Sequence, residues 1–429
     1  MDATGQPVAC TQPRTHPARI AGFAMGERNH FSNFLPVIAA LVQAGAEVHV
    51  WTDPAFRAAL AEVGAGVTDI FAAGDLAAAD AETRPVPARF VSFAAAHADR
   101  LLAEVQGWGA DLVLCESFAV VGRVVAARLG LPWINVLPGH IADAAACRAA
   151  IQRDQPASIG PACRAAVARL RQVDGFGDIT PWSYIADPSP WLNIEMEPGE
   201  WWTPAEQAAL HPVAFFGSAA AAGTIIADGR GFDPARLRLY VSFGTVIWRY
   251  WQDEALAALG EIAAAVRAIP GATAVIGLGG AALSAEVVAR LNCAAVRTVG
   301  FADQARELAQ ADLFITHQGT GSTHEAIAAG VPMLSWPFFG DQPAVAARAQ
   351  ALGLALPLAA GQSGTTGGLA AANVGAQIAL AVAQRPAMVQ AIQDARAWDI
   401  RARSARPGIA WRVMNLARMA RQRAWLAEG

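Results

Sequence analysis

A polar turn in the C-terminal half carries the side chains best suited to bind an anion. The apolar run Asp312–Thr316 predicts a strand, and the residues from Thr320 onward predict a helix. The turn between them reads His-Gln-Gly-Thr-Gly-Ser, from His317 to Ser322. Small residues at such a turn let backbone N–H groups approach an anion, and the helix dipole adds positive potential. The imidazole and hydroxyls can donate to phosphate oxygens, although Thr320 and Ser322 would equally suit an ordinary capped helix.

Several other kinds of chemistry lack the residues that they need. The chain contains no lysine, which excludes Schiff bases, pyridoxal phosphate chemistry and the Walker A lysine. The first strand-to-helix turn, residues 26–30, has one glycine where dinucleotide binding needs the GxGxxG pattern. No Asp-x-Asp triplet and no HExxH spacing of histidines occurs, so we expect no metal site. The net charge of −4 predicts no nucleic-acid partner.

The elements that must position the polar turn alternate between strands and helices. Apolar runs predict strands at 19–25, 47–52, 111–115, 133–137, 237–243, 274–278, 312–316 and 333–336. Amphipathic segments predict helices, among them 32–44, 54–63 and 119–129. The pattern blurs over 141–210, a stretch that we interpret as helical and rich in tryptophan. The alternation predicts an α/β fold, with parallel sheets that carry helices on both faces.

A change of composition divides the chain into two halves. Residues 217–236 are rich in glycine and alanine and lack a strong period, as a linker would. We therefore predict a flexible tail at 1–18, a first domain at 19–216, a second domain at 237–408 and a long amphipathic helix at 409–429.

The segment 300–343 resembles the donor-binding signature of the UDP-glycosyltransferase superfamily, the family-1 glycosyltransferases. The matching positions are Phe301, Gln304, His317, Gly319, Ser322, Glu325, the run 330–332 and the pair Asp341-Gln342. Phe301 stands where the family has tryptophan, and Gly321 where it has asparagine. The resemblance extends loosely over residues 19–425, and within the superfamily the chain is similar to bacterial glycosyltransferases that act on macrolides and other natural products. It implies the GT-B fold, in which two Rossmann-like domains face each other across a cleft.

The resemblance also implies what each matching residue binds. Phe301 would stack on the nucleotide base, Gln304 would lie near base and ribose, and Glu325 would accept hydrogen bonds from the ribose. His317, Thr320 and Ser322 would bind the diphosphate, and Thr245 would contact a phosphate. Gly319 and Gly321 belong to the same donor-binding turn, where Gly321 lacks the side-chain donor of the family's asparagine. Asp341 and Gln342 would bind the donor sugar, and this pair favours UDP-glucose as the donor, followed by a TDP-deoxysugar.

Glycosyl transfer in this family needs a base that removes the proton of an acceptor hydroxyl, and a histidine suits that task near neutral pH. The resemblance gives this role to His30, which we expect in the loop after the first strand. Its partner would be an acid that orients the imidazole and stabilises its protonated form. Glu116, which follows the strand 111–115, stands where the family usually has aspartate.

The acceptor side is predicted from aromatic residues and one histidine. His140 follows another strand end, and the tryptophan-rich stretch supplies five aromatic residues: Trp182, Tyr184, Trp191, Trp201 and Trp202. These side chains would form a pocket for a hydrophobic small molecule, although the aromatic residues would equally suit a packed core.

The sequence therefore predicts an inverting, metal-independent glycosyltransferase that uses a nucleotide sugar as co-substrate and no cofactor. Two alternatives stay open: a nucleotide-sugar 2-epimerase of the same fold, and a non-catalytic nucleotide-sugar-binding partner protein. The polar N-terminus, five scattered cysteines and lack of an uninterrupted apolar run of about 18 residues predict a cytoplasmic protein without a transmembrane segment. The identity of the acceptor and the oligomeric state stay open.

Overall fold

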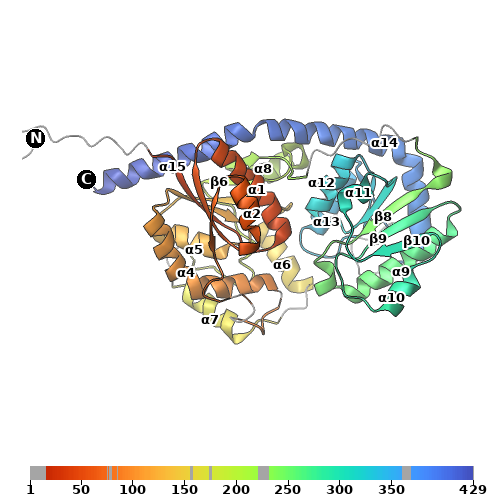
Figure 1. The fold of residues 1–429 in the computed structure, drawn as a ribbon, viewed down its shortest axis with the longest axis horizontal. Coiled ribbons are helices and arrows are strands. Elements are labelled where there is room, and N and C mark those ends of the chain that lie inside the picture. The colour runs from red at the N-terminus through yellow and green to blue at the C-terminus, as the bar shows by residue number, and fades with distance from the viewer. Residues whose placement is uncertain are drawn as a thin grey trace, which may run out of the picture.

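The computed structural model describes residues 16–74, 76, 80–84, 86–154, 158–172, 176–220, 231–359 and 369–428. Residues 1–15 of the predicted tail and 221–230 of the predicted linker therefore lie outside the described residues. The described chain forms two α/β domains that lie side by side and are joined along one edge by long helices (Figure 1).

The first domain is built on a seven-stranded parallel sheet. Its strands are β1 (Arg19–Phe23), β2 (Glu47–Thr52), β3 (Gly66–Asp69), β4 (Leu112–Glu116), β5 (Trp133–Leu137), β6 (Leu192–Glu195) and β7 (Val213–Phe215). Its helices are α1 (Arg28–Gln43), α2 (Arg57–Glu62), α4 (Arg89–Trp108), α5 (Val120–Leu129), α6 (Ala144–Asp154), α7 (Pro161–Leu170) and α8 (Pro204–Ala209). The strands lie in the order β3-β2-β1-β4-β5-β6-β7.

The second domain is built on a six-stranded parallel sheet. Its strands are β8 (Arg238–Ser242), β9 (Thr273–Gly277), β10 (Val296–Val299), β11 (Leu313–Thr316), β12 (Met333–Ser335) and β13 (Ala355–Pro357). Its helices are α9 (Gln252–Ala268), α10 (Ala285–Leu291), α11 (Gln304–Leu308), α12 (Thr320–Ala329) and α13 (Gln342–Ala351). The strands lie in the order β10-β9-β8-β11-β12-β13.

Both sheets therefore follow the Rossmann order, in which the chain starts in the middle and later reverses direction across the sheet. The reversal lies between β1 and β4 in the first sheet and between β8 and β11 in the second. Ligands of open parallel sheets bind at the carboxyl ends of the strands beside this point. The predicted α/β architecture of two Rossmann-like domains is confirmed.

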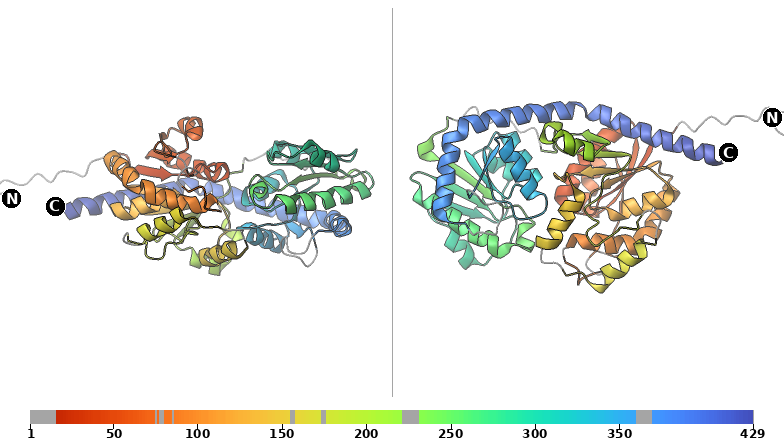
Figure 2. Two further views of the ribbon diagram at one scale, coloured as in Figure 1. Left: turned by 90° about the horizontal axis from the view of Figure 1, so that it is seen from below. Right: turned by 180° about the vertical axis from the view of Figure 1, so that it is seen from behind.

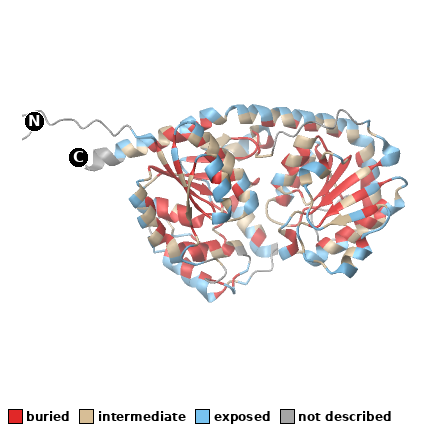
Figure 3. Ribbon diagram, in the orientation of Figure 1, coloured by how far each residue is buried: buried red, intermediate tan, exposed pale blue. Residues whose placement is uncertain are grey.

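The strands read as short apolar runs because helices cover both faces of each sheet. Every residue of β4 is buried, including its last one, Glu116. Figure 3 shows the same pattern across both domains, with buried strands inside and exposed residues on the outer faces of the helices. A buried carboxylate at a strand end is unusual and needs a partner.

Two long helices connect the domains after the second sheet ends. Helix α14 (Ala371–Ser404) begins against α9, contains Pro386 and bends on its way to the first domain (Figure 2). There the Asp399 side chain accepts a hydrogen bond from the Ser218 backbone N–H at 2.6 Å. Helix α15 (Arg406–Glu428) then packs against α1 and β4. None of the helices in the described part of the chain is both long and apolar enough to cross a membrane.

The predicted elements agree with the structure where the apolar runs are long. Strands β2 and β5 have the predicted bounds, and the last helix begins three residues before its predicted start at Ile409. The stretch 141–210, which we interpreted as helical, also contains β6. Strand β6 has four residues, too few to show a period of its own.

Candidate active site

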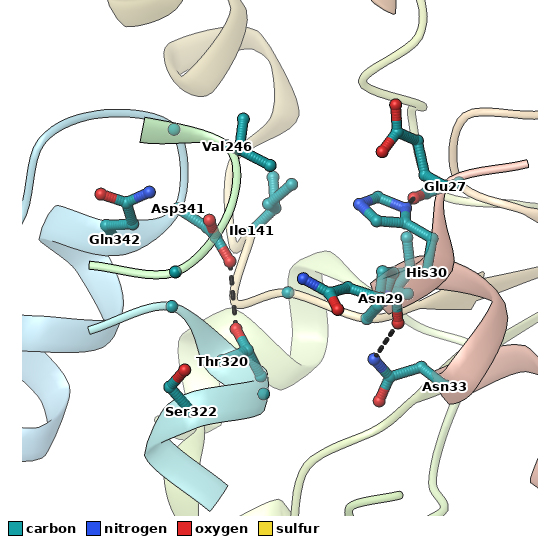
Figure 4. Close-up of a pocket in the computed structure, with 18 of the residues that line it drawn as sticks. Glu27, Asn29, His30, Asn33, Ile141, Val246, Thr320, Ser322, Asp341 and Gln342 are labelled. Atoms are coloured by element: carbon teal, nitrogen blue, oxygen red, sulfur yellow. Dashed lines mark hydrogen bonds between the residues drawn. The ribbon is translucent and has the colours of Figure 1, made fainter. Parts of the chain in front are cut away.

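A cavity of about 1330 Å³ lies between the two domains, where the carboxyl ends of both sheets meet. Figure 4 shows His30 on α1 at one side of this cavity, with Thr320 and Asp341 of the second domain at the other. The first domain lines it with loops after β1, β4 and β5, and the second domain with loops after β8, β10, β11 and β12. Both chain reversals therefore open into the same cavity.

His30 and Glu116 form a hydrogen-bonded pair across the chain reversal of the first sheet. The Nδ1 atom of His30 donates to Oε1 of Glu116, which also accepts from the Phe118 backbone N–H at 2.9 Å and from the Ser117 hydroxyl at 3.0 Å. The His30 ring stacks on the Phe118 ring with 3.9 Å between centroids. His30 lies in the first turn of α1 and not in the predicted loop, because the helix begins at Arg28.

The two side chains of this pair differ in how far they are buried. The side chain of Glu116 is 1% exposed, and that of His30 is 24% exposed. Burial alone would lower the pKa of His30, but the charge and hydrogen bond of Glu116 outweigh it, with smaller contributions from Glu27 and Asp341. The pKa of His30 is therefore raised above its ordinary value. Since Nδ1 is bound to Glu116, Nε2 is the nitrogen left to accept a proton.

The predicted anion-binding turn forms the N-terminus of α12, and no side chain caps it. The N-cap residue, Gly319, makes no side-chain hydrogen bond to the helix. The Thr320 hydroxyl donates instead to Oδ2 of Asp341 at 3.0 Å, and the Ser322 hydroxyl accepts from Nε2 of Gln304 at 3.0 Å. The interpretation of these hydroxyls as ordinary helix caps is therefore wrong, and within the described part of the chain no N-cap side chain competes with a ligand for the N–H groups of the first turn.

His317 lies beside this turn as a neutral imidazole. Burial lowers its pKa to about 4. Its Nδ1 atom is buried without a hydrogen-bond partner among the described residues. Gly319 is required here because a Cβ at this position would come within 2.5 Å of the imidazole Nε2 of His317. Gln318 lies between them in the left-handed region at φ 62°, which turns the backbone sharply into the helix.

The nucleoside end of the predicted donor site is also assembled in the structure. Phe301 is 73% exposed, so its ring is available as a stacking surface. Gln304 donates to the Glu325 carboxylate and accepts weakly from the Tyr240 hydroxyl at 3.4 Å. Burial raises the pKa of Glu325, which the bond from Gln304 partly offsets. Tyr240 was not predicted, because it lies inside the apolar run of β8 and shows no polar signal.

Three further predicted donor residues differ in how they face the cavity. Thr245 and Gly321 are exposed and line it. Gln342 also lines it, but its Oε1 accepts from the backbone N–H groups of Phe338 and Phe339, at 2.9 and 3.2 Å. Only the amide N–H groups of Gln342 are left for a sugar, and Figure 4 places this side chain beyond Asp341 as seen from His30.

Asp341 reaches across the cavity toward the first domain. A Cβ at Gly139 would come within 2.5 Å of its Oδ2 atom. Burial raises the pKa of Asp341, while the hydrogen bond from Thr320 lowers it. The carboxylate that would bind donor sugar is therefore held against the domain that carries His30.

Of the residues predicted for the acceptor side, all except Tyr184 lie outside the cavity lining. His140 is buried and bound to Glu197, Trp182 lies in the core of the first domain, and Trp191 lies at the surface. Trp182, Trp201 and Trp202 belong to packed hydrophobic clusters, as the alternative interpretation of these side chains held. Of the predicted aromatics, Tyr184 reaches the cavity. The wall around it consists mostly of small and aliphatic residues: Ile141, Ala142, Ala144, Ala145, Cys147, Ile151, Ile185 and Ala186.

The described residues contain no cluster of side chains suited to bind a metal ion. Among them, no group of three or more His, Cys, Asp or Glu side chains could hold a metal ion. His317 and His324 belong to different hydrogen-bonding environments, one beside the helix terminus and one at the domain interface.

Solved structures share this arrangement of two domains around a cavity. The glycosyltransferase of kitacinnamycin superposes with a TM-score of 0.66 at 22% identity, covering 94% of this chain and 99% of that chain. The calicheamicin glycosyltransferase superposes with a TM-score of 0.64 at 21% sequence identity, and the match covers 95% of this chain and 99% of that chain. VinC, a glycosyltransferase solved in complex with dTDP, gives 0.58 at 21%, covering 94% and 100%. The protein therefore has the fold of GT-B glycosyltransferases.

The second domain adds a match in sequence. Residues 239–374 match the family described as UDP-glucoronosyl and UDP-glucosyl transferase. Zeaxanthin glucosyltransferase of Pseudescherichia vulneris is 37% identical over 111 residues, 26% of this chain and 25% of that protein. UDP-glucuronosyltransferase 2C1 of Oryctolagus cuniculus is 56% identical over 43 residues, 10% and 9% of the two chains. The matched segments thus span a quarter or less of these relatives, and they confirm the resemblance to the UDP-glycosyltransferases.

Proposed function

We propose that the protein is an inverting, metal-independent glycosyltransferase that moves a sugar, glucose first, from a nucleoside diphosphate to a hydroxyl of a hydrophobic small molecule. The observation that carries the proposal is the His30–Glu116 pair facing the uncapped N-terminus of α12 across one cavity. A base in one domain and an anion site in the other are the two requirements of this reaction.

His30 supplies the base. Its Nε2 takes the proton of the acceptor hydroxyl while that oxygen forms a bond to the anomeric carbon. The bond from that carbon to the diphosphate oxygen breaks on the opposite face, so the configuration inverts. Glu116 holds the imidazole through Nδ1–H and stabilises the imidazolium that forms.

The departing diphosphate is stabilised by fixed dipoles. The N–H groups at the start of α12, with the side chains of Thr320 and His317 beside them, face the position of the developing charge. The exposed Phe301 ring accepts a nucleotide base by stacking. Asp341 and Gln342 favour UDP-glucose, and a glucosyltransferase among the similar proteins supports this choice. A TDP-sugar is the second candidate donor, because VinC was solved with dTDP.

The small and aliphatic residues of the wall favour an apolar acceptor, and the cavity volume of about 1330 Å³ favours a large one. We further propose that the protein works in the cytoplasm, since the cysteines of the described residues are unpaired.

The decisive experiment screens UDP- and TDP-sugars by thermal shift and then incubates the best donor with an aglycone library, with product analysis by mass spectrometry. Expected are a glycosylated aglycone, an inverted anomeric configuration by NMR and unchanged turnover in EDTA. A strict need for a divalent ion in the chemical step would contradict the metal-free mechanism. A sugar product formed from the donor alone would favour the epimerase.

A further inference from the structure

A line of ionisable side chains, buried at its centre, crosses the domain interface beside the cavity. Glu197, just after β6, accepts a hydrogen bond from Nδ1 of His140 at 2.8 Å. Its other oxygen lies 3.7 Å from Nε2 of His324 on α12. On the far side, Nε2 of His140 lies 4.0 Å from Glu206, which binds Arg348 on α13 at 2.7 Å. The line thus begins and ends in the second domain and passes through the first.

This line is enclosed by aromatic rings. The ring centroids of Trp202 and His140 are 4.0 Å apart, and those of Trp201 and His324 are 5.2 Å apart. The side chain of Glu197 is 1% exposed. Burial alone would raise the pKa of Glu197, but the hydrogen bond from His140 and the nearby imidazole of His324 outweigh burial and lower the pKa. A buried carboxylate of this kind depends on both partners, because an unpaired buried charge is strongly destabilising.

The two helices held at the ends of the line are those that build the donor site. His324 lies one turn after Thr320, on the helix whose N-terminus faces the cavity. Arg348 lies on α13, which begins directly after Asp341. Two carboxylates of the domain that carries His30 therefore hold both donor helices of the other domain.

We propose that Glu197 and Glu206 are positioning residues that set the donor helices α12 and α13 at the distance from His30 that transfer requires. This inference rests on the proposed function. The base and the anomeric carbon belong to different domains, so the alignment of attack depends on how the domains are held. A displacement of about 1 Å can reduce a rate by about 100-fold without affecting either binding site alone.

The test compares Glu197→Gln with Glu200→Gln in the full-length protein. Glu200 is a matched control, because it also forms an ion pair of 2.7 Å with an arginine far away in the sequence, Arg401 on α14, but this pair lies at the surface and holds neither donor helix. Glu197→Gln is expected to lower kcat by about 10- to 100-fold, while the Kd for UDP stays within about twofold. Hydrogen exchange is expected to rise in the first turns of α12. Glu200→Gln is expected to change none of these measurements.

Glu206→Gln serves as the second variant if Glu197→Gln does not fold, because Glu206 is partly exposed. It should give a smaller kcat loss and faster exchange in α13. Wild-type kcat in both variants would overturn the inference, as would losses of kcat and UDP affinity that merely follow a falling melting temperature. Failure of the wild-type protein to transfer sugar would refute the proposed function instead, and hydrogen exchange would still test the coupling of the domains.

Discussion

The two walls of the central cavity are built in opposite ways. The proposed donor wall comes mostly from one continuous stretch, 301–342, and presents the N-terminus of α12, which has no side-chain cap. The proposed acceptor wall comes from two segments of the first domain, 141–151, which includes the start of α6, and 184–186, and it presents mostly small and aliphatic side chains. A nucleoside diphosphate is recognised by directed hydrogen bonds, whereas an apolar acceptor is recognised by shape.

His30 and Glu116 belong to neither pattern. They are a polar, fully assembled pair at the edge of the apolar wall, and their geometry exists before any ligand arrives. The comparison therefore separates three tasks: donor binding, acceptor binding and removal of the acceptor proton. A single substitution can test each of them.

The largest effect is expected from His30→Ala. Transfer to hydroxyl acceptors should fall by about 10²–10⁴-fold, the usual contribution of a general base. Donor binding, measured by titration calorimetry with UDP, should stay unchanged because His30 lies in the other domain. Turnover near the wild-type level would remove His30 from the mechanism.

Glu116→Gln should come next, with a loss of about 10²-fold in kcat. The raised pKa of His30 means that neutral base is lost as the pH falls through that value, which sets the acidic limb of the pH–rate profile. Without the charge of Glu116 the pKa of His30 should drop, so this limb should move to lower pH while the plateau falls. Glu116→Asp should also lose activity, because the shorter side chain no longer reaches Nδ1. An unmoved acidic limb in Glu116→Gln would show that the pair does not titrate as one unit.

On the donor wall, Glu325→Ala should weaken binding of UDP by about 1.5–3 kcal/mol, the range for hydrogen bonds to a charged group. The acceptor KM should stay the same. Calorimetry on the variant measures the first quantity and steady-state kinetics the second. Equal losses for donor and acceptor would mean that the two walls are not independent.

The smallest effect is expected from Trp191→Ala, because this surface residue does not line the cavity. Its acceptor KM should match the wild type and its stability should change by no more than about 0.5 kcal/mol. The matched change on the wall itself, Ile141→Ala, should raise the acceptor KM several-fold. A large effect at Trp191 with none at Ile141 would reverse our assignment of the acceptor wall.

Much of this molecule could be predicted from the sequence because the determinants are local. Alternating apolar runs predict parallel strands and helices, and a strand followed by small residues and a helix favours an anion-binding turn. The donor residues from Phe301 to Asp341 follow one another within such units, so their order in the chain already places most of them together. His30 and Glu116 were predicted through the family resemblance, and the reversal of the chain between β1 and β4 explains why they meet.

The tertiary structure decided what depends on contacts between distant segments. His140, Trp182 and Trp191 are of residue types that often line ligand pockets. In the structure His140 and Trp182 are buried in the interior, whereas Trp191 lies at the surface. An aromatic side chain gains as much from burial in a core as from contact with a ligand, so its type alone cannot separate the two roles. The interaction of Glu197 with His324 likewise has no signature in the chain, because it exists only where the two domains meet.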